Sequence, residues 1–205
     1  MRNHLLFIRK GTMEKILYLM RHGQTLFNQR HKVQGFCDSP LTELGINQAK
    51  IARRYFDKNS ITFDHAYSST SERASDTLEI ITDIEYKRVK GLKEWNFGTF
   101  EGESEDLNPK LPYGDFFAQY GGEAEKDFQK RVSDTILQLM QNDNHNSVLM
   151  VSHGASCRTF MRFWGHKSSV DHIGRIGNCC ILKFAFENNE FTLLEVINHN
   201  FDELK

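Results

Sequence analysis

The chain has 205 residues, a formal net charge of -1 and 26% charged residues. A chain of this length suits one α/β domain or at most two small ones, and it buries about 70% of its unfolded surface on folding. The composition is that of a globular protein and excludes a disordered chain. The nearly neutral charge provides no overall attraction to nucleic acid or to anionic lipid, so we expect neither as a partner.

The N-terminal segment shows neither a membrane helix nor a secretory signal. Its apolar run, Leu5-Leu6-Phe7-Ile8, is shorter than the ~7–15 residues of a signal sequence and the ~18 of a membrane helix. Met13 offers a second start directly before a strand pattern. We therefore expect residues 1–12 to be an extension that can be deleted with little effect on the fold, and residues 13–205 to form a single domain.

The four cysteines, Cys37, Cys157, Cys179 and Cys180, form no C-x-x-C pair. Adjacent cysteines do not normally form a disulfide, so free thiols in the cytoplasm are the simpler interpretation. No two pairs of ligands have zinc-finger spacing. We expect a cytoplasmic protein with no metal and no other cofactor, and the sequence leaves the oligomeric state open, a homodimer included.

The hydrophobic pattern predicts alternating strands and helices. In chain order these are a buried strand over residues 16–20, a helix with Thr42 as its N-cap, a strand over 63–68, a helix over 74–81, a strand over 84–89, an amphipathic helix over 128–140, a strand over 147–152, a helix over 155–164, and a hairpin of strands 180–186 and 191–197. Alternation of this kind predicts a three-layer α/β/α fold with a mostly parallel sheet. The hairpin adds an antiparallel edge strand.

Polar side chains follow four of the predicted strands. Arg21 and His22 follow the first, Arg73 the second, Glu94 the third and His153 the fourth. Because ligands of open parallel sheets bind beyond the carboxyl ends of the strands, these side chains should line one pocket. The pocket would hold two arginines, two histidines and one carboxylate.

Such a set of side chains suits a phosphoryl group. Arginine presents a fork of donors that matches phosphate oxygens, and phosphoryl transfer depends mainly on charge neutralisation and positioning. A neutral histidine could attack phosphorus and hold it as phosphohistidine, while Glu94 protonates the departing alkoxide. No C-x5-R, D-x-D, G-x-S-x-G, G-x-x-x-x-G-K or G-x-G-x-x-G motif occurs, so histidine is the nucleophile that remains.

An ordered series of short motifs spans residues 15 to 160. These are Leu19-Met20-Arg21-His22-Gly23-Gln24-Thr25 with Asn28, Gln34-Gly35, Asp38-Ser39-Pro40-Leu41-Thr42 with Gly45, Gln48-Ala49, Ser68-Ser69, Arg73-Ala74 with Thr77, Glu94 with Gly98, Glu101-Gly102, Gly121-Gly122-Glu123 with Arg131-Val132, and Val151-Ser152-His153-Gly154. Through this series the chain resembles the histidine phosphatase superfamily, in its phosphoglycerate mutase-like branch of broad-specificity phosphatase type.

The resemblance implies a role for each matching position. His22 matches the phosphorylated histidine and Glu94 the acid/base residue. The positions implied for the phosphate clamp and the substrate are Arg21, Arg73, His153, Asn28, Thr25, Gln34, Gly35 and Gly154. The expected ligand is a small phosphorylated metabolite.

Two departures favour a phosphatase over a mutase. Cofactor-dependent mutases of this family carry a longer insertion between the acid and the second histidine, with paired arginines that grip the substrate carboxylate. The interval from Trp95 to Ser152 is short here and has no adjacent arginines. Three alternatives remain open: a phosphomonoesterase, a phosphoglycerate mutase, and a non-catalytic binding module. The aromatic-rich residues 103–120 are expected to form a lid that sets specificity.

Overall fold

The computed structural model describes residues 14–142, 144–170 and 174–204, so the expectation about residues 1–12 lies outside the described residues. Its centre is a six-stranded sheet with strand order β3-β2-β4-β1-β5-β6. The strands are β1 (Lys15–Arg21), β2 (His65–Ser69), β3 (Tyr86–Val89), β4 (Ser147–Ser152), β5 (Ile181–Glu187) and β6 (Glu190–Ile197). The first four run parallel, and the hairpin pairs antiparallel to β1 through β5.

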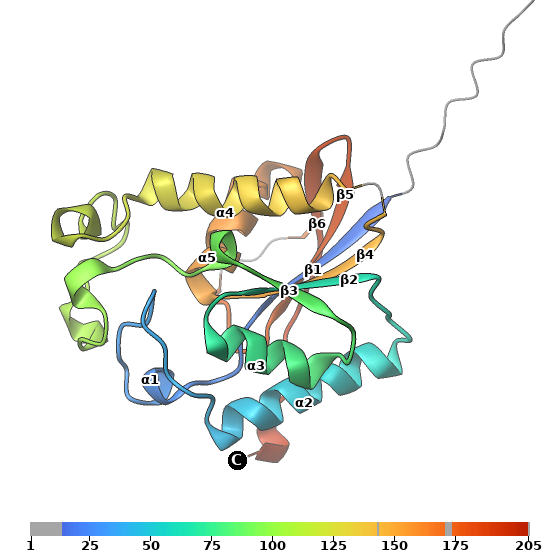
Figure 1. Ribbon diagram of the computed structural model, residues 1–205, viewed down its shortest axis with the longest axis horizontal. Helices are drawn as coiled ribbons and strands as arrows, with labels where there is room; N and C mark the ends of the chain where they lie inside the picture. The colour runs from blue at the N-terminus through green and yellow to red at the C-terminus, as the bar shows by residue number, and fades with distance from the viewer. Residues whose placement is uncertain (1–13, 143, 171–173, 205) are drawn as a thin grey trace, which may run out of the picture.

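Helices cover both faces of this sheet (Figure 1). They are α1 (Leu26–Gln29), α2 (Glu43–Lys58), α3 (Glu72–Ile81), α4 (Glu125–Met140) and α5 (Gly154–Phe163), with short 3-10 turns at Lys90–Leu92, Gly98–Phe100, Glu105–Leu107, Phe117–Tyr120, Gly165–Lys167 and Asp202–Leu204. Helices α2 and α3 lie on one face, while α4 and α5 lie on the other. The three-layer α/β/α fold expected from the sequence is therefore confirmed.

Strand β1 explains why its sequence is continuously apolar. Leu17 and Leu19 belong to the core beneath α4 and α5, whereas Tyr18 and Met20 belong to the core beneath α2 and α3. Successive side chains of a strand point to opposite faces, so a strand covered on both sides needs an apolar residue at every position. Strand β1 therefore contributes to both cores, and it ends at Arg21 on the carboxyl edge of the sheet.

Local signals set the helix boundaries largely as expected. The side chain of Thr42 accepts a hydrogen bond from the amide of Gly45 and caps α2. Helix α3 begins at Glu72, two residues before the predicted start, and β3 begins at Tyr86, two residues later. The hairpin contributes two strands, of which β6 is the edge and β5 lies between β6 and β1.

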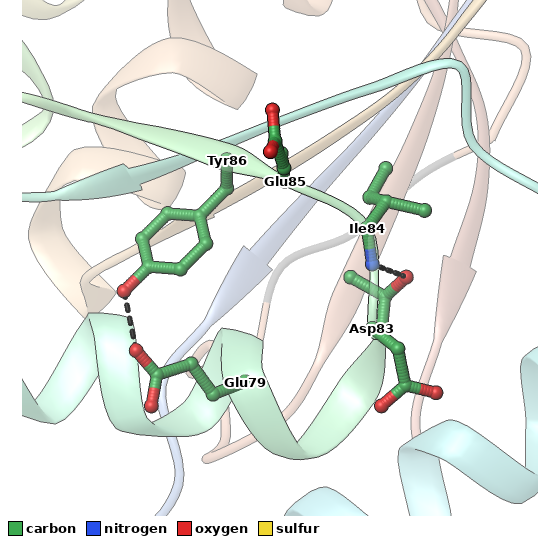
Figure 2. A pocket seen from close by; sticks show the side chains of 6 residues that line it. Glu79, Asp83, Ile84, Glu85 and Tyr86 are labelled. Carbon is green, nitrogen blue, oxygen red and sulfur yellow. Dashed lines mark hydrogen bonds between the residues drawn. The ribbon is translucent and has the colours of Figure 1, made fainter.

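The hollows of the surface are not confined to one edge of the sheet. One of about 520 Å³ lies at the amino end of β3, lined by Glu79, Asp83, Glu85 and their neighbours. Figure 2 shows the hydroxyl of Tyr86 donating to the carboxylate of Glu79. Asp83 pairs with Arg53 at 2.5 Å. Tyr86, Glu79 and Asp83 are thus engaged within the protein. The residues expected to act in chemistry lie at the opposite edge of the sheet.

Candidate active site

The side chains predicted to act together do converge at the carboxyl edge of the parallel strands. Arg21 ends β1 and pairs in register with Ser152 of β4, so His22 and His153 emerge side by side. Their ring centroids lie 5.3 Å apart, with the planes inclined at 66°. Nε of Arg73, in the first turn of α3, lies 3.3 Å from Nε2 of His22. Three segments far apart in sequence therefore meet at one point.

The hydrogen bonds of His22 define its tautomer. Nδ1 lies 2.7 Å from the carbonyl oxygen of Gly23, which can only accept, so Nδ1 carries the proton. Nε2 then holds a lone pair and accepts from Nε of Arg73. Burial, followed by the charges of Arg73 and Arg21, holds the pKa of His22 well below its usual range. The imidazole is neutral at neutral pH, and its unprotonated nitrogen faces a guanidinium.

Two other groups at this edge have buried nitrogens without partners. His153 is fully buried, and neither of its ring nitrogens has a hydrogen-bond partner among the described residues. Nε of Arg21 is also buried and unpartnered, although its Nη1 donates to the carbonyl of Ile176 at 2.7 Å. Burial and the neighbouring cations lower the pKa of His153 well below its usual value. Unpaired buried donors of this kind cost about 1–3 kcal/mol each and indicate a place where a ligand completes the bonding.

Arg73 is held rigidly by the loop that follows Gln34. Its Nη1 donates to the carbonyl of Cys37 at 2.8 Å and to Asp38 at 2.9 Å, and its Nη2 donates to the carbonyl of Gly35 at 2.9 Å. Asp38 also accepts the amide of Glu72 at the start of α3. Four donor bonds therefore fix this fully buried guanidinium against His22.

Glu101 in turn shapes the loop that holds Arg73. Its carboxylate accepts the amides of Gly35, Phe36 and Cys37 at 2.7–3.0 Å. A Cβ added at Gly35 would lie 2.0 Å from the carbonyl oxygen of Trp95 and 2.4 Å from Oε1 of Glu101. Only glycine permits this close approach. Gly35 thus acts on the site through the loop backbone and is not among the residues that line the hollow.

Glu94 lies at the N-terminus of α5. Its Oε1 accepts from the amides of Trp95 and Ser156 and from the hydroxyl of Ser156, while Oε2 accepts only from the amide of Ala155 at 2.8 Å. The amides of Ala155 and Ser156 belong to the first turn of α5. Since Oε2 has a single partner and Glu94 lines the hollow, this oxygen remains available to a ligand.

A second ion pair holds the backbone that carries Glu94. Arg131 binds Glu123 through Nε and Nη2, each at 2.7 Å. The same guanidinium donates to the carbonyls of Gly91, Lys93 and Glu94 at 2.9–3.0 Å. All three guanidinium nitrogens of Arg131 are therefore engaged in holding this segment in place.

The site hollow has a volume of about 150 Å³ and is lined by half of the predicted clamp and substrate positions. It is lined by Arg21, His22, Asn28, Lys32, Val33, Gln34, Glu94, Phe97, Glu105, Asn108, Tyr113, Gly154, Ala155, Arg158 and Arg175. Thr25 does not line it. Its hydroxyl donates to Gln34 at 2.6 Å and accepts the amide of Asn28, which caps α1. Arg73 and His153 lie behind His22.

Two arginines of the wall were missed in the sequence. Arg158 follows Gly154 by four residues, so the helical spacing of α5 places both on one side, and this signal was available. Arg175 lies in the loop that precedes β5, where no periodicity marks a functional position. Residues 103–120 contribute Glu105, Asn108 and Tyr113 to the wall. Their role as a lid stays a prediction.

Comparison with known proteins identifies the family. The model of the histidine phosphatase superfamily, branch 1, matches residues 17–199. The chain belongs to this superfamily. A 2,3-bisphosphoglycerate-dependent phosphoglycerate mutase of Methylorubrum populi is 32% identical over 167 residues, covering 73% of this chain and 78% of that protein.

Solved structures similar to this chain include a phosphoglycerate mutase and a phosphoserine phosphatase. A phosphoglycerate mutase from Bacillus anthracis superposes with a TM-score of 0.77 at 25% identity, covering 91% of this chain and 94% of the other. A phosphoserine phosphatase from Entamoeba histolytica, in complex with 3-phosphoglyceric acid, has a TM-score of 0.70 at 31% identity, covering 90% and 98%. As a member of this superfamily, the chain is an enzyme of the hydrolase or isomerase type.

The described residues also bear on the requirements of a metal site and of a membrane span. Within residues 14–142, 144–170 and 174–204, no group of three or more His, Cys, Asp or Glu side chains could hold a metal ion. None of the helices in these ranges is both long and apolar enough to cross a membrane.

Proposed function

We propose that this chain is a metal-independent phosphomonoesterase that hydrolyses small phosphorylated metabolites through a phosphohistidine at His22. The observation that carries the proposal is the state of that imidazole. Gly23 fixes the proton on Nδ1, burial and two guanidinium groups keep the ring neutral, and Nε2 retains its lone pair. A nucleophilic histidine needs each of these three properties.

The reaction divides into two balanced steps. In the first, the lone pair of Nε2 forms a bond to phosphorus, the ester P–O bond breaks, and the departing alkoxide takes a proton from Glu94. In the second, water attacks phosphorus, gives its proton to Glu94 and breaks the P–N bond, which releases orthophosphate and restores neutral His22. Oε2 of Glu94, with its single partner, suits both transfers.

The remaining residues neutralise charge on the transferring group. Arg21 and His153 have buried nitrogens without partners, which are free to donate to phosphoryl oxygens. Arg73 is pinned by Asp38 with its Nε directed at His22, so a phosphoryl oxygen arriving at Nε2 meets this guanidinium. Rigid donors of this kind stabilise the transition state without reorganising.

A phosphoglycerate mutase is the second candidate, because the relative from Methylorubrum populi carries that name. The two activities share the phosphohistidine and differ in its acceptor, which is water or the bound metabolite. The interval between Glu94 and His153 has no adjacent arginines, and this favours the phosphatase. A non-catalytic binding module is less well supported, since His22, Glu94 and the clamp residues are all present.

A trapping experiment tests the proposal. The enzyme is mixed with ³²P-labelled ester, quenched in alkali, where phosphohistidine survives, and digested for mapping. We expect the label on the peptide that contains His22 and faster release of orthophosphate than isomerisation of 3-phosphoglycerate with a bisphosphoglycerate primer. Label on another residue contradicts the mechanism, and faster isomerisation favours the mutase.

We also propose a cytoplasmic location, since Cys37, Cys157, Cys179 and Cys180 are free thiols. Nucleic acid and membranes are not proposed as partners. A homodimer remains an open alternative to a monomer, which light scattering on the purified chain distinguishes. Secretion into an oxidising compartment would contradict the location.

A further inference from the structure

A second hollow adjoins the candidate active site. It has a volume of about 630 Å³ and is lined by Glu105, Asn108, Pro109, Leu111, Tyr113, Arg158, Arg162, Gly174 and Arg175. Five of these residues, among them Arg158 and Arg175, also line the inner hollow that contains His22. The two arginines therefore stand at the boundary between the hollows, and a substrate whose phosphorus lies at His22 extends outward past them.

The arginines at this boundary have unused donors. In the described ranges, neither the side chain of Arg158 nor that of Arg175 makes a hydrogen bond or an ion pair within the protein. Nε of Arg158 is buried without a partner, and so is Oδ1 of Asn108 beside it. Arg131 is the contrasting case, because all its nitrogens are engaged. An unused buried donor on Arg158, beside the exposed guanidinium of Arg175 at the mouth of the site, points to a ligand that supplies the acceptors.

The charges around the boundary favour an anion. Burial lowers the pKa of Arg21, and the charges of Arg175 and Arg158 lower it further, against a raising contribution from Glu94. Three guanidinium groups therefore repel one another across the pocket. The carboxylates in the wall are Glu94, which is bound by α5 amides, and Glu105, which lies 3.9 Å from Nδ1 of His31.

We propose that Arg158 and Arg175 form a second anion site, so that the preferred substrates are small phosphomonoesters bearing a further carboxylate or phosphoryl group. The proposal rests on the proposed function, since it places the reacting phosphoryl group at His22. Arginine suits this task because its planar fork pairs with carboxylate and phosphate alike. The grip on a second anion then comes from α5 and the loop before β5, and not from the interval between Glu94 and His153.

Matched ligands test the second anion site directly. 3-Phosphoglycerate and glycerol 3-phosphate differ only in a carboxylate, while fructose 1,6-bisphosphate and fructose 6-phosphate differ in a phosphoryl group. Dissociation constants are measured by calorimetry in a His22→Ala background, where hydrolysis does not consume the ligand. We expect the member with the extra anion to bind about tenfold or more tightly in at least one pair, as charge-assisted hydrogen bonds allow.

Adding Arg158→Gln or Arg175→Gln should bring that ratio close to one. Lys50→Gln, which removes an equal charge from the exposed face of α2, should leave it unchanged. Arg175 is exposed, so its variant remains informative if Arg158→Gln fails to fold. A ratio near one in both pairs before any arginine is changed, or a ratio that survives both substitutions, overturns the second anion site.

Release of orthophosphate by the unmodified enzyme is followed separately on all four esters. Its absence, together with a preserved binding ratio, refutes the phosphatase and leaves the anion site standing. Its presence without a binding preference refutes the anion site alone. The two readouts therefore distinguish failure of the proposed function from failure of this inference.

Discussion

The two edges of the central sheet each carry a pair of histidines, and the pairs are built differently. At the carboxyl edge, the rings of His22 and His153 meet edge to face, with centroids 5.3 Å apart. At the amino edge, His65 and His145 stack at 3.8 Å with an angle of 12° between their planes. A hollow adjoins each pair, of about 150 Å³ and 350 Å³ respectively. Residue type and concavity alone do not separate the two edges.

The two histidine pairs differ in their hydrogen bonding. At the amino edge, His145 contacts Asn144 through Nδ1 at 2.8 Å and the hydroxyl of Tyr67 through Nε2 at 2.5 Å, and Nδ1 of His65 contacts Asp64 at 3.1 Å. At the carboxyl edge, both nitrogens of His153 lack partners. A partnered pair stabilises the fold, whereas unpartnered nitrogens beside guanidinium groups are prepared for an external ligand. Unused polar atoms thus mark the site better than the histidines themselves.

Replacing a histidine at each edge should give the largest contrast. His22→Ala removes the proposed nucleophile, and turnover should fall by a factor of about 10³ or more, since no other group can form the covalent intermediate. His145→Ala should retain turnover and lower the melting temperature, because it leaves Tyr67 without its partner. Initial rates with p-nitrophenyl phosphate and thermal unfolding of both variants measure this. Residual turnover above a few per cent in His22→Ala would identify another nucleophile.

The carboxylate beside each pair offers the next contrast. Glu94→Gln removes the proposed proton donor, so turnover of an alkyl phosphate should fall by about 10²–10⁴-fold. The loss should be much smaller with p-nitrophenyl phosphate, whose leaving group needs no proton. Asp64→Asn at the amino edge should alter stability alone, since Asp64 accepts the amides of Asn146 and Ser147.

Comparing kcat for the two leaving groups in each variant decides the role of Glu94. An equal loss of turnover on both esters would assign this residue to positioning and not to proton transfer.

The fold was largely predictable because hydrophobic periodicity and capping residues mark its strands and helices in the sequence. The alternation of Leu17 and Leu19 with Tyr18 and Met20 requires two covered faces, and the cap at Thr42 is readable from sequence. Short elements with few apolar residues are hard to delimit from sequence. Strand β3, for example, is an edge strand with two exposed residues, so its start depends on pairing with β2 and not on its own sequence.

The site was predictable only where residues follow strands. Arg21, His22 and His153 could be placed because strand ends meet at one edge. The supporting contacts could not, since the grip of Asp38 on Arg73 and of Arg131 on the backbone near Glu94 joins segments with no shared periodicity. Arg175 was missed for the same reason, because the role of a loop residue depends on the three-dimensional fold and leaves no periodic pattern in the sequence.

The two pairs should also shape how stability depends on pH. Burial, before the nearby positive charges, lowers the pKa values of His22, His153 and His145 in the native state. The unfolded chain therefore binds protons first, so stability is complete above about pH 6.5 and is lost as pH falls toward the lower native values. Each histidine contributes a slope of up to about 1.4 kcal/mol per pH unit in this window.

Urea unfolding at pH 7.5 and pH 5.5 measures this loss of unfolding free energy. The substitution His145→Gln should reduce the loss by the contribution of one histidine. Turnover should persist below pH 6.5, because His22 stays neutral there. A stability that is constant between these pH values, or turnover that is lost with an ordinary histidine pKa near 6.5, would contradict the neutral state of His22, His153 and His145.

Removal of metal ions by a chelator should produce the smallest effect, leaving turnover and the melting temperature unchanged. Although histidines and carboxylates occur together at each edge, the described residues contain no group of three or more that could hold a metal ion, and catalytic zinc needs at least three protein ligands. The charge that a metal would supply comes here from Arg21 and Arg73. Turnover and melting temperature are compared before and after dialysis against EDTA. Inactivation that zinc or magnesium reverses would show that guanidinium groups do not suffice, and would move the chemistry of the carboxyl edge to a different mechanism.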